Sequence, residues 1–194
     1  FEAYKDGDYK KAIVLGNKLL QIYAENDDCD CIEYAVDMSN LAMVFDRLQL
    51  YPQAEKYYKQ AAELKKRCGG ESLSYADTLN NLAIVYNQTS RQTEALRLHR
   101  KVLEIREAKL GREHADFLHS LYHIGNTYEL LGEYDKAIEY HAMALRNNTF
   151  STLELADVHG ALARAYEAKG NYKKAIYYYE ICLDLIEKAR GCDT

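Results

Sequence analysis

The chain has 194 residues, of which 48% are hydrophobic, and this composition excludes a chain that is disordered as a whole. Its formal net charge of -5 argues against sequence-independent binding to nucleic acid and gives no support to binding an anionic membrane surface, since both usually need a basic patch. No window approaches the roughly 18 uncharged apolar residues that suggest a bilayer-spanning helix.

Apolar periodicity predicts a nearly all-helical chain, and the presence of one proline in the whole sequence agrees with this. In chain order, we expect helices near 8–23, 34–48, 53–67, 74–89, 92–109, 115–131, 134–147, 153–169 and 172–189.

A short pattern recurs along these helices. In one copy, Gly125 is followed three residues later by Tyr128, and Ala137 lies in the next helix. The small residues of the first helices are Ala42, Ala83, Gly125 and Ala163, and the aromatic residues are Phe45, Tyr86, Tyr128 and Tyr166. The second helices carry aligned alanines, Ala12, Ala54, Ala95, Ala137 and Ala175, and bulky side chains four residues later, Tyr58, His99, His141 and Tyr179. Small residues allow two helices to approach closely, so the pattern predicts paired helices that stack as repeats.

The alanine spacings of 42, 41, 42 and 38 residues divide the chain into repeats. We expect a single array over 1–194, with a partial first repeat (1–33), three repeats (34–73, 74–113 and 114–150) and a last repeat (151–194).

The small-residue, aromatic and alanine pattern resembles the tetratricopeptide repeat. The long spacing is similar to the extended subtype of kinesin light chain and many bacterial repeat proteins, and the stretches 78–86 and 103–114 carry that match. The resemblance implies an all-α fold, a right-handed superhelical solenoid of antiparallel helix pairs with about nine helices. It also implies a scaffold or adaptor whose concave surface, lined by the first helix of each pair, holds a protein or peptide.

Polar side chains occupy the positions that the apolar stripe of the first helices skips, so we expect them to face solvent and contact a partner. The candidate binding residues are Asn40, Arg47, Asn80, Asn81, Asn87, His119, Tyr122, His123, Asn126 and Arg164. Asparagine both donates and accepts hydrogen bonds, arginine can hold a carboxylate, and tyrosine offers a rigid amphipathic surface. The alternative interpretation is a polar solvated face.

Two groups of potential metal ligands give only a weak signal for a metal site. His119 and His123 lie four residues apart and could in principle chelate a metal, but no third ligand lies at a helpful spacing. Cys29 and Cys31 form a lone C-x-C pair in a predicted inter-repeat loop. We therefore expect no metal and no cofactor, and we interpret the five irregularly spaced cysteines as reduced and the protein as cytoplasmic.

The last helix carries more apolar side chains than its inward face needs. We expect Ile176, Tyr179, Leu183 and Ile186 to point inward, which leaves Tyr178, Ile181 and Leu185 for another contact. This predicts that more chain follows, or that the end meets a partner or a second copy.

The sequence lacks a phosphate-binding glycine loop, a nucleophile elbow and a usable pair of catalytic carboxylates, so we expect no enzyme. The predicted function is a protein- or peptide-binding adaptor. The alternative is a regulatory or sensor module of a larger bacterial signalling or transcription-regulating protein.

Overall fold

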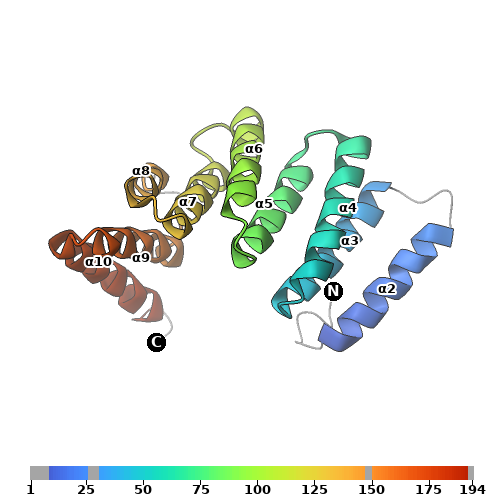
Figure 1. Ribbon diagram of the computed structural model, residues 1–194, viewed down its shortest axis with the longest axis horizontal. Coiled ribbons are helices and arrows are strands. Elements are labelled where there is room, and N and C mark those ends of the chain that lie inside the picture. Colours follow the sequence, from blue (N-terminus) through green and yellow to red (C-terminus); the bar gives the residue numbers. More distant parts are fainter. Residues whose placement is uncertain (1–8, 26–30, 147–149, 192–194) are drawn as a thin grey trace. The chain divides into compact units, whose positions relative to one another are not determined.

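All secondary structure within the part of the chain that the computed structural model describes, residues 9–25, 31–146 and 150–191, is helical (Figure 1). The helices are α2 (Tyr9–Glu25), α3 (Cys31–Arg47), α4 (Tyr51–Gly69), α5 (Leu73–Gln88), α6 (Gln92–Leu110), α7 (Ala115–Leu130), α8 (Tyr134–Ala144), α9 (Thr152–Ala168) and α10 (Tyr172–Gly191). The all-α prediction is confirmed. The largest differences in the ends are at α3, which begins at Cys31, and at α8, which ends at Ala144.

The helices form two compact units, residues 1–105 (unit 1) and 106–194 (unit 2). In unit 1, α3 packs against α2 and α4, and α4 packs against α5. In unit 2, α7 packs against α8, α8 against α9, and α9 against α10. Each unit therefore has the expected paired helices. The single superhelical array over the whole chain stays a prediction.

The aligned alanines lie where the paired helices meet. Ala54, Ala95 and Ala137 are fully buried, and Ala175 is 3% exposed. The closest approach is at Gly125 of α7, where an added Cβ atom would lie 2.5 Å from the ring of His141 on α8. The bulky residues four positions after the aligned alanines are buried at Tyr58, His99 and His141, all at most 1% exposed.

The repeated aromatic residue closes the turn between the two helices of a pair. Its carbonyl oxygen accepts a hydrogen bond from the backbone N–H five residues later, at 2.8–2.9 Å from Arg91 to Tyr86, from Glu133 to Tyr128 and in the two other turns. The residue before that donor has positive φ in every case, Gln49, Ser90, Gly132 and Gly170. This is a left-handed helix cap, which glycine adopts at the lowest cost.

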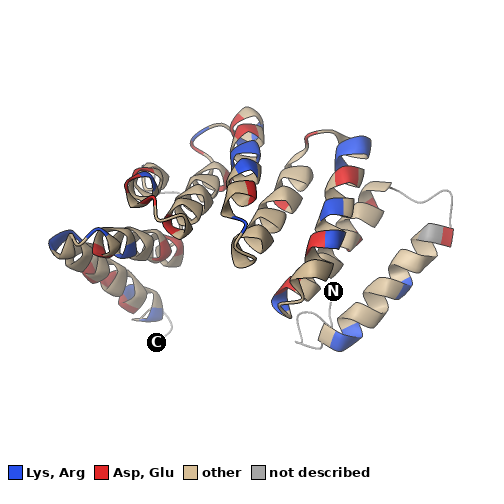
Figure 2. Ribbon diagram, viewed as in Figure 1, with Lys and Arg blue, Asp and Glu red and all other residues tan. Residues whose placement is uncertain are grey.

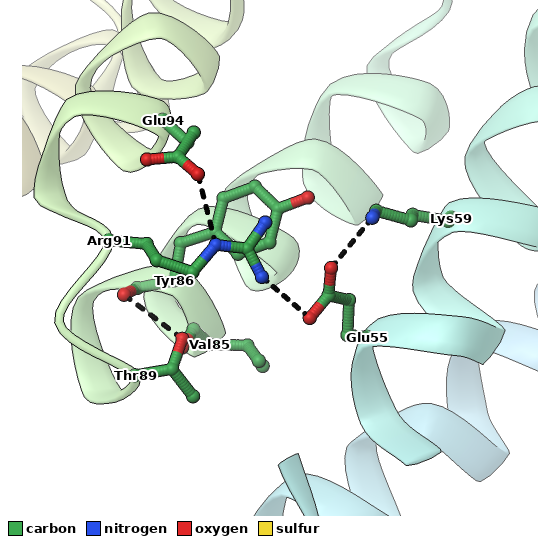
Figure 3. Close-up of polar contacts among 7 residues, drawn as sticks. All are labelled: Glu55, Lys59, Val85, Tyr86, Thr89, Arg91 and Glu94. Atoms are coloured by element: carbon green, nitrogen blue, oxygen red, sulfur yellow. Dashed lines mark hydrogen bonds and ion pairs between the residues drawn. The ribbon is translucent and has the colours of Figure 1, made fainter. Parts of the chain in front are cut away.

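Figure 3 shows how the second of these turns is fixed within unit 1. The Arg91 guanidinium lies 4.0 Å from the centre of the Tyr86 ring and 2.8 Å from a carboxylate oxygen of Glu55 on α4. Glu94 pairs with Arg91 at 3.0 Å, and Lys59 pairs with Glu55 at 2.6 Å. The pKa of Arg91 is raised by its hydrogen bonds to the two carboxylates, so the network holds α4 against the turn.

Two buried cations join successive repeats, and the sequence analysis missed both. Lys65 of α4 donates to Thr78 Oγ1 at 2.8 Å on α5, and Arg106 of α6 donates to Ser120 Oγ at 3.0 Å on α7. Lys65 and the Thr78 hydroxyl both donate to the Ser74 carbonyl oxygen, and Arg106 and the Ser120 hydroxyl both donate to the Asp116 carbonyl oxygen. Both cations stand eleven residues after an aligned alanine, Ala54 or Ala95 in the sequence, and this register is the signal that could have found them.

The cysteine prediction is wrong for one pair. Cys31 and Cys68 form a disulfide that links the start of α3 to the end of α4. Cys31 is helical rather than part of a loop, because α3 extends to it, and Cys29 lies outside the described residues. Cys182 is a free thiol.

The inward face of α10 also differs from the prediction. Ile176 and Leu183 are 57% exposed and Tyr179 is 41% exposed, whereas Tyr178 is half-buried. The reason is that Tyr178 stacks on Tyr166 of α9, with ring centres 5.5 Å apart, which rotates the helix so that Tyr179 faces outward. Ile181 and Leu185, expected to be to spare, are half-buried with Tyr178, and Ile186 is also half-buried.

Candidate functional site

The candidate binding residues lie on the first helices of the pairs, and they fall into two groups. Unit 1 brings together Asn40 and Arg47 of α3 with Asn80, Asn81 and Asn87 of α5. Unit 2 brings together His119, Tyr122, His123 and Asn126 of α7 with Arg164 of α9. We call the surfaces that these two groups mark the first-helix faces. A groove that runs through both units stays a prediction.

Most of the ten residues are partly accessible. Arg47 and Arg164 are exposed, and seven of the others are half-buried. The expectation of solvent exposure is wrong for Asn80, which is 8% exposed. Asn80 lies four residues after Ala76 and three before Ala83, both fully buried, so it belongs to the same inward row of α5.

Two amide oxygens on these faces have no hydrogen-bond partner among the residues that the structure describes. They are the side-chain oxygens of Asn80 on α5 in unit 1 and of Asn126 on α7 in unit 2. Both oxygens are buried, so each marks a polar position closed to solvent beneath the first-helix faces.

The guanidinium of Arg164 joins the two first helices of unit 2. Its Nε donates to Glu129 Oε1 at 2.9 Å and its Nη2 lies 3.4 Å from Glu129 Oε2. Arg164 therefore already holds a carboxylate, that of α7, and its half-exposed side chain helps to fix α9 against α7.

His123 of α7 and His141 of α8 are neutral histidines on either side of Tyr122. Burial lowers the pKa of His123 to about 4 and that of His141 to about 3, so both rings are neutral at pH 7. Tyr122 packs between them, with ring centres 5.7 Å from His123 and 5.6 Å from His141. Within the described residues, no three His, Cys, Asp or Glu side chains are grouped so that they could hold a metal ion.

His119 instead lines a small pocket of unit 2. The pocket has a volume of about 30 Å³ and is lined by His119, Tyr122, Phe150, Glu154, Asp157 and Val158. His119 Nε2 lies 3.1 Å from Glu154 Oε1, and its ring centre is 4.8 Å from that of Phe150. We call this the His119 pocket. Four of its members, Phe150, Glu154, Asp157 and Val158, are absent from the predicted site.

Glu154 is held in place by the start of α9. Ser151 and Glu154 form a capping box, in which the Ser151 N–H donates to Glu154 Oε2 at 2.7 Å. These bonds and His119 lower the pKa of Glu154, so it carries a negative charge at neutral pH. The sequence signal for this residue was present, because a serine followed three residues later by glutamate marks a helix start.

Charge is divided unequally between the two kinds of helix. The first helices, α3, α5, α7 and α9, contain nine acidic and two basic residues. The second helices, α2, α4, α6, α8 and α10, contain eleven acidic and eighteen basic residues. Figure 2 shows the basic residues concentrated on helices such as α4 and α6, whereas α5 and α7 are nearly free of them. The first helices therefore carry a net negative charge, and the second helices carry a net positive charge.

Comparison with known proteins identifies the repeats. Family models described as tetratricopeptide repeat match residues 3–67, 38–108 and 74–149, and a further one matches 158–193. No curated protein sequence matches the chain. No helix among residues 9–25, 31–146 and 150–191 has the length and apolar character to cross a membrane.

Solved structures with the same fold share little sequence with the chain. BtubC (BKLC) from P. vanneervenii is 23% identical, with a TM-score of 0.86, over 97% of this chain and 77% of that one. The kinesin light chain TPR-like repeats from Podosopora anserina are 20% identical, with a TM-score of 0.79, over 97% of this chain and 92% of that one. MamA is 18% identical, with a TM-score of 0.70, over 98% and 95%. These likenesses show the fold.

Proposed function

The chain belongs to the tetratricopeptide repeat family, a family of protein–protein interaction adaptors, and we propose that it binds a protein or peptide through its first-helix faces. The fold is typically a non-catalytic scaffold, and the proposed role is binding without chemistry. The observation that carries the proposal is the polar side chains on the first helices of each unit, of which Asn81 and Asn126 are half-buried and Arg47 and Arg164 exposed. Partly accessible amide side chains both donate and accept hydrogen bonds, so they can pair with the backbone groups of a bound peptide.

The first test removes amides from both faces. Asn81→Ala combined with Asn126→Ala takes away two half-buried polar side chains. We expect this double variant to capture less partner from an extract of the source cell, with an unchanged melting temperature. Stability should hold because Asn126 loses an oxygen that accepts no hydrogen bond from the described residues.

A matched control uses two exposed amides on a second helix. Gln53→Ala with Gln60→Ala removes the same kind of group twice from α4. This control should capture as much partner as the wild type. Equal losses of capture and melting temperature in the Asn81 and Asn126 variant would show that those residues only support the fold, and unchanged capture would refute the binding faces.

We further propose that α10 associates with a second copy of the chain. Tyr172, Ile176, Tyr179 and Leu183 form an exposed apolar row at spacings of four, three and four residues, which is the spacing of a helix–helix seam. Leu183 lies eight residues after the aligned Ala175. The equivalent residue of α4 is Ala62, eight residues after Ala54, and Ala62 packs against α5. Leu183 therefore occupies a position of the repeat that packs against another helix in unit 1.

Light scattering tests this association. We expect the wild-type chain to form a dimer at high concentration and Ile176→Glu with Leu183→Glu to be monomeric. Lys173→Glu, on an exposed residue of the same helix, is the control that should still associate. A wild-type chain that stays monomeric would refute the proposal.

A cytoplasmic location also stays a prediction. The Cys31–Cys68 disulfide is an observation against it, because disulfides persist mainly in oxidising compartments. Thiol labelling of the protein in its source cell would decide: labelling of both cysteines supports the cytoplasm, and protection of both contradicts it.

A further inference from the structure

We infer that the His119 pocket binds the ammonium end of a lysine side chain, so that the partner contributes a basic segment to unit 2. The inference rests on the proposed function and gives the partner a chemical class. It is argued from the walls of the pocket, from the charge around it and from its volume.

The walls of the pocket combine aromatic rings with carboxylates. Tyr122 and Phe150 supply ring surfaces, whose faces attract cations, and Glu154 and Asp157 supply negative charge. Glu154 and Asp157 are three residues apart on α9, so their carboxylates lie on one side of the helix. Rings beside carboxylates are the surroundings that an alkylammonium group prefers, because the apolar part of the chain and its charge are both accommodated.

The carboxylates have capacity for a further donor. Glu154 accepts from the Ser151 N–H through Oε2 and contacts His119 through Oε1. An ionised carboxylate has about four acceptor positions, so an ammonium group can share it without displacing either contact. Asp157 also lines the pocket and is exposed, so its carboxylate is accessible to an arriving cation.

The surrounding charge favours the same ligand. The first helices of unit 2, α7 and α9, carry five acidic residues and a single basic residue, Arg164. The Arg164 guanidinium is paired with Glu129, so it does not leave a net positive charge at this part of the face. A basic segment would therefore be attracted along the first-helix face of unit 2, and an acidic one repelled.

The volume of the pocket distinguishes lysine from arginine. A water molecule needs at least about 10–15 Å³ of cavity, so the 30 Å³ of the pocket accommodates about two atoms of that size. The Cε and Nζ atoms of lysine meet this limit. The planar guanidinium of arginine, with a carbon and three nitrogens, is larger, so less of it enters the pocket.

The test uses small probes with the full chain. Amide chemical shifts are followed by NMR at pH 8 during titration with n-butylammonium chloride, and parallel titrations use n-butylguanidinium and n-butanol. We expect butylammonium to bind with millimolar affinity and to shift the amides of residues 119, 122, 154 and 157 together. Butylguanidinium should bind several-fold more weakly, and butanol should leave these shifts unchanged.

Asp157→Asn supplies the matched variant, because Asp157 is exposed and its replacement keeps the shape of the side chain. We expect the Kd for butylammonium to rise about fivefold, as the loss of one nearby opposite charge implies. Glu139→Gln removes an equal charge from an exposed position of α8 and should leave the Kd unchanged. Equal shifts with butanol, tighter binding of the guanidinium, or equal effects of the two variants would overturn the inference.

The outcomes also separate this inference from the proposed function. If the pocket fails to bind butylammonium while the Asn81 and Asn126 variant still loses its partner, the lysine inference alone is wrong. If butylammonium binds as expected while that variant keeps all its partner, binding at the amide positions is wrong and the pocket stands.

Discussion

Two glycines of unit 2 provide the sharpest test of the packing argument, because the same substitution should have opposite effects at them. Gly125 lies within α7 and Gly160 within α9, and both glycines are buried. Alanine is favoured over glycine in a helix by about 1 kcal/mol, so propensity predicts that both variants are more stable.

The space around each glycine changes this expectation for Gly125 but not for Gly160. A Cβ atom at Gly125 would lie 2.5 Å from Cε1 and 2.6 Å from Nδ1 of His141, whose ring is fully buried and cannot swing into solvent. Overpacking of this kind costs about 1–3 kcal/mol, so Gly125→Ala should lose about 1 kcal/mol after the propensity gain. A Cβ atom at Gly160 would meet Cys182 Sγ at 3.6 Å, an ordinary contact, so Gly160→Ala should gain about 0.5–1 kcal/mol.

Thermal unfolding followed by circular dichroism measures the difference. We expect the melting temperature to fall by about 2–4 °C for Gly125→Ala and to rise by a similar amount for Gly160→Ala. In a His141→Ala background the ring is gone, so Gly125→Ala should become stabilising. If Gly125→Ala stabilises the wild-type chain as much as Gly160→Ala does, the argument that Gly125 exists to admit the His141 ring is refuted.

Three further predictions concern the charges and the disulfide. His123 and His141 have pKa values of about 4 and about 3 in the folded chain but about 6.5 in the unfolded chain, so the unfolded state binds more protons. The free energy of unfolding, measured by urea titration, should therefore fall as the pH drops from 7 to 4. A flat profile would contradict the burial of these rings. In the same assay, Lys65→Met should lower the free energy of unfolding by less than about 1 kcal/mol and Lys65→Ala by about 2–4 kcal/mol, because methionine keeps the packing of the buried side chain. Equal losses would mean that the hydrogen bonds of the ammonium group dominate. Reduction should lower the stability of unit 1 by up to about 4 kcal/mol, since the Cys31–Cys68 crosslink closes a loop with a sequence separation of 37, and Cys68→Ser should show no further change with reductant.

The sequence by itself determined the helices and their pairing. Residues such as Ala54, Ala95 and Ala137 recur at a nearly constant interval, and the small residue and aromatic of each first helix keep a fixed distance from them. A repeat of this kind presents the same local packing problem several times, so a single sequence carries several copies of its solution. The buried histidines followed from that register, because each stands four residues after an aligned alanine.

The candidate site was predictable only in part. The ten residues lie on the first helices, as the repeat register required, but the exposure of each depends on the rotation of its helix. Asn80 is buried because it shares a row with Ala76 and Ala83, and Tyr179 is exposed because Tyr178 stacks on Tyr166. A difference of one residue rotates a side chain by about 100° on a helix, which a periodic pattern alone does not resolve.

Only the tertiary structure brought together groups that are distant in the chain. His119 meets Glu154 and Phe150 from another helix and the segment before it, and Lys65 meets the hydroxyl of Thr78 on the next repeat. The Cys31–Cys68 disulfide depends likewise on the ends of two helices lying side by side, with Cα atoms 6.5 Å apart. The sequence determined which helices form, because helix formation and pairing depend on local periodicity. The structure decided which side chains share a pocket, because that depends on how each helix is rotated against its neighbour.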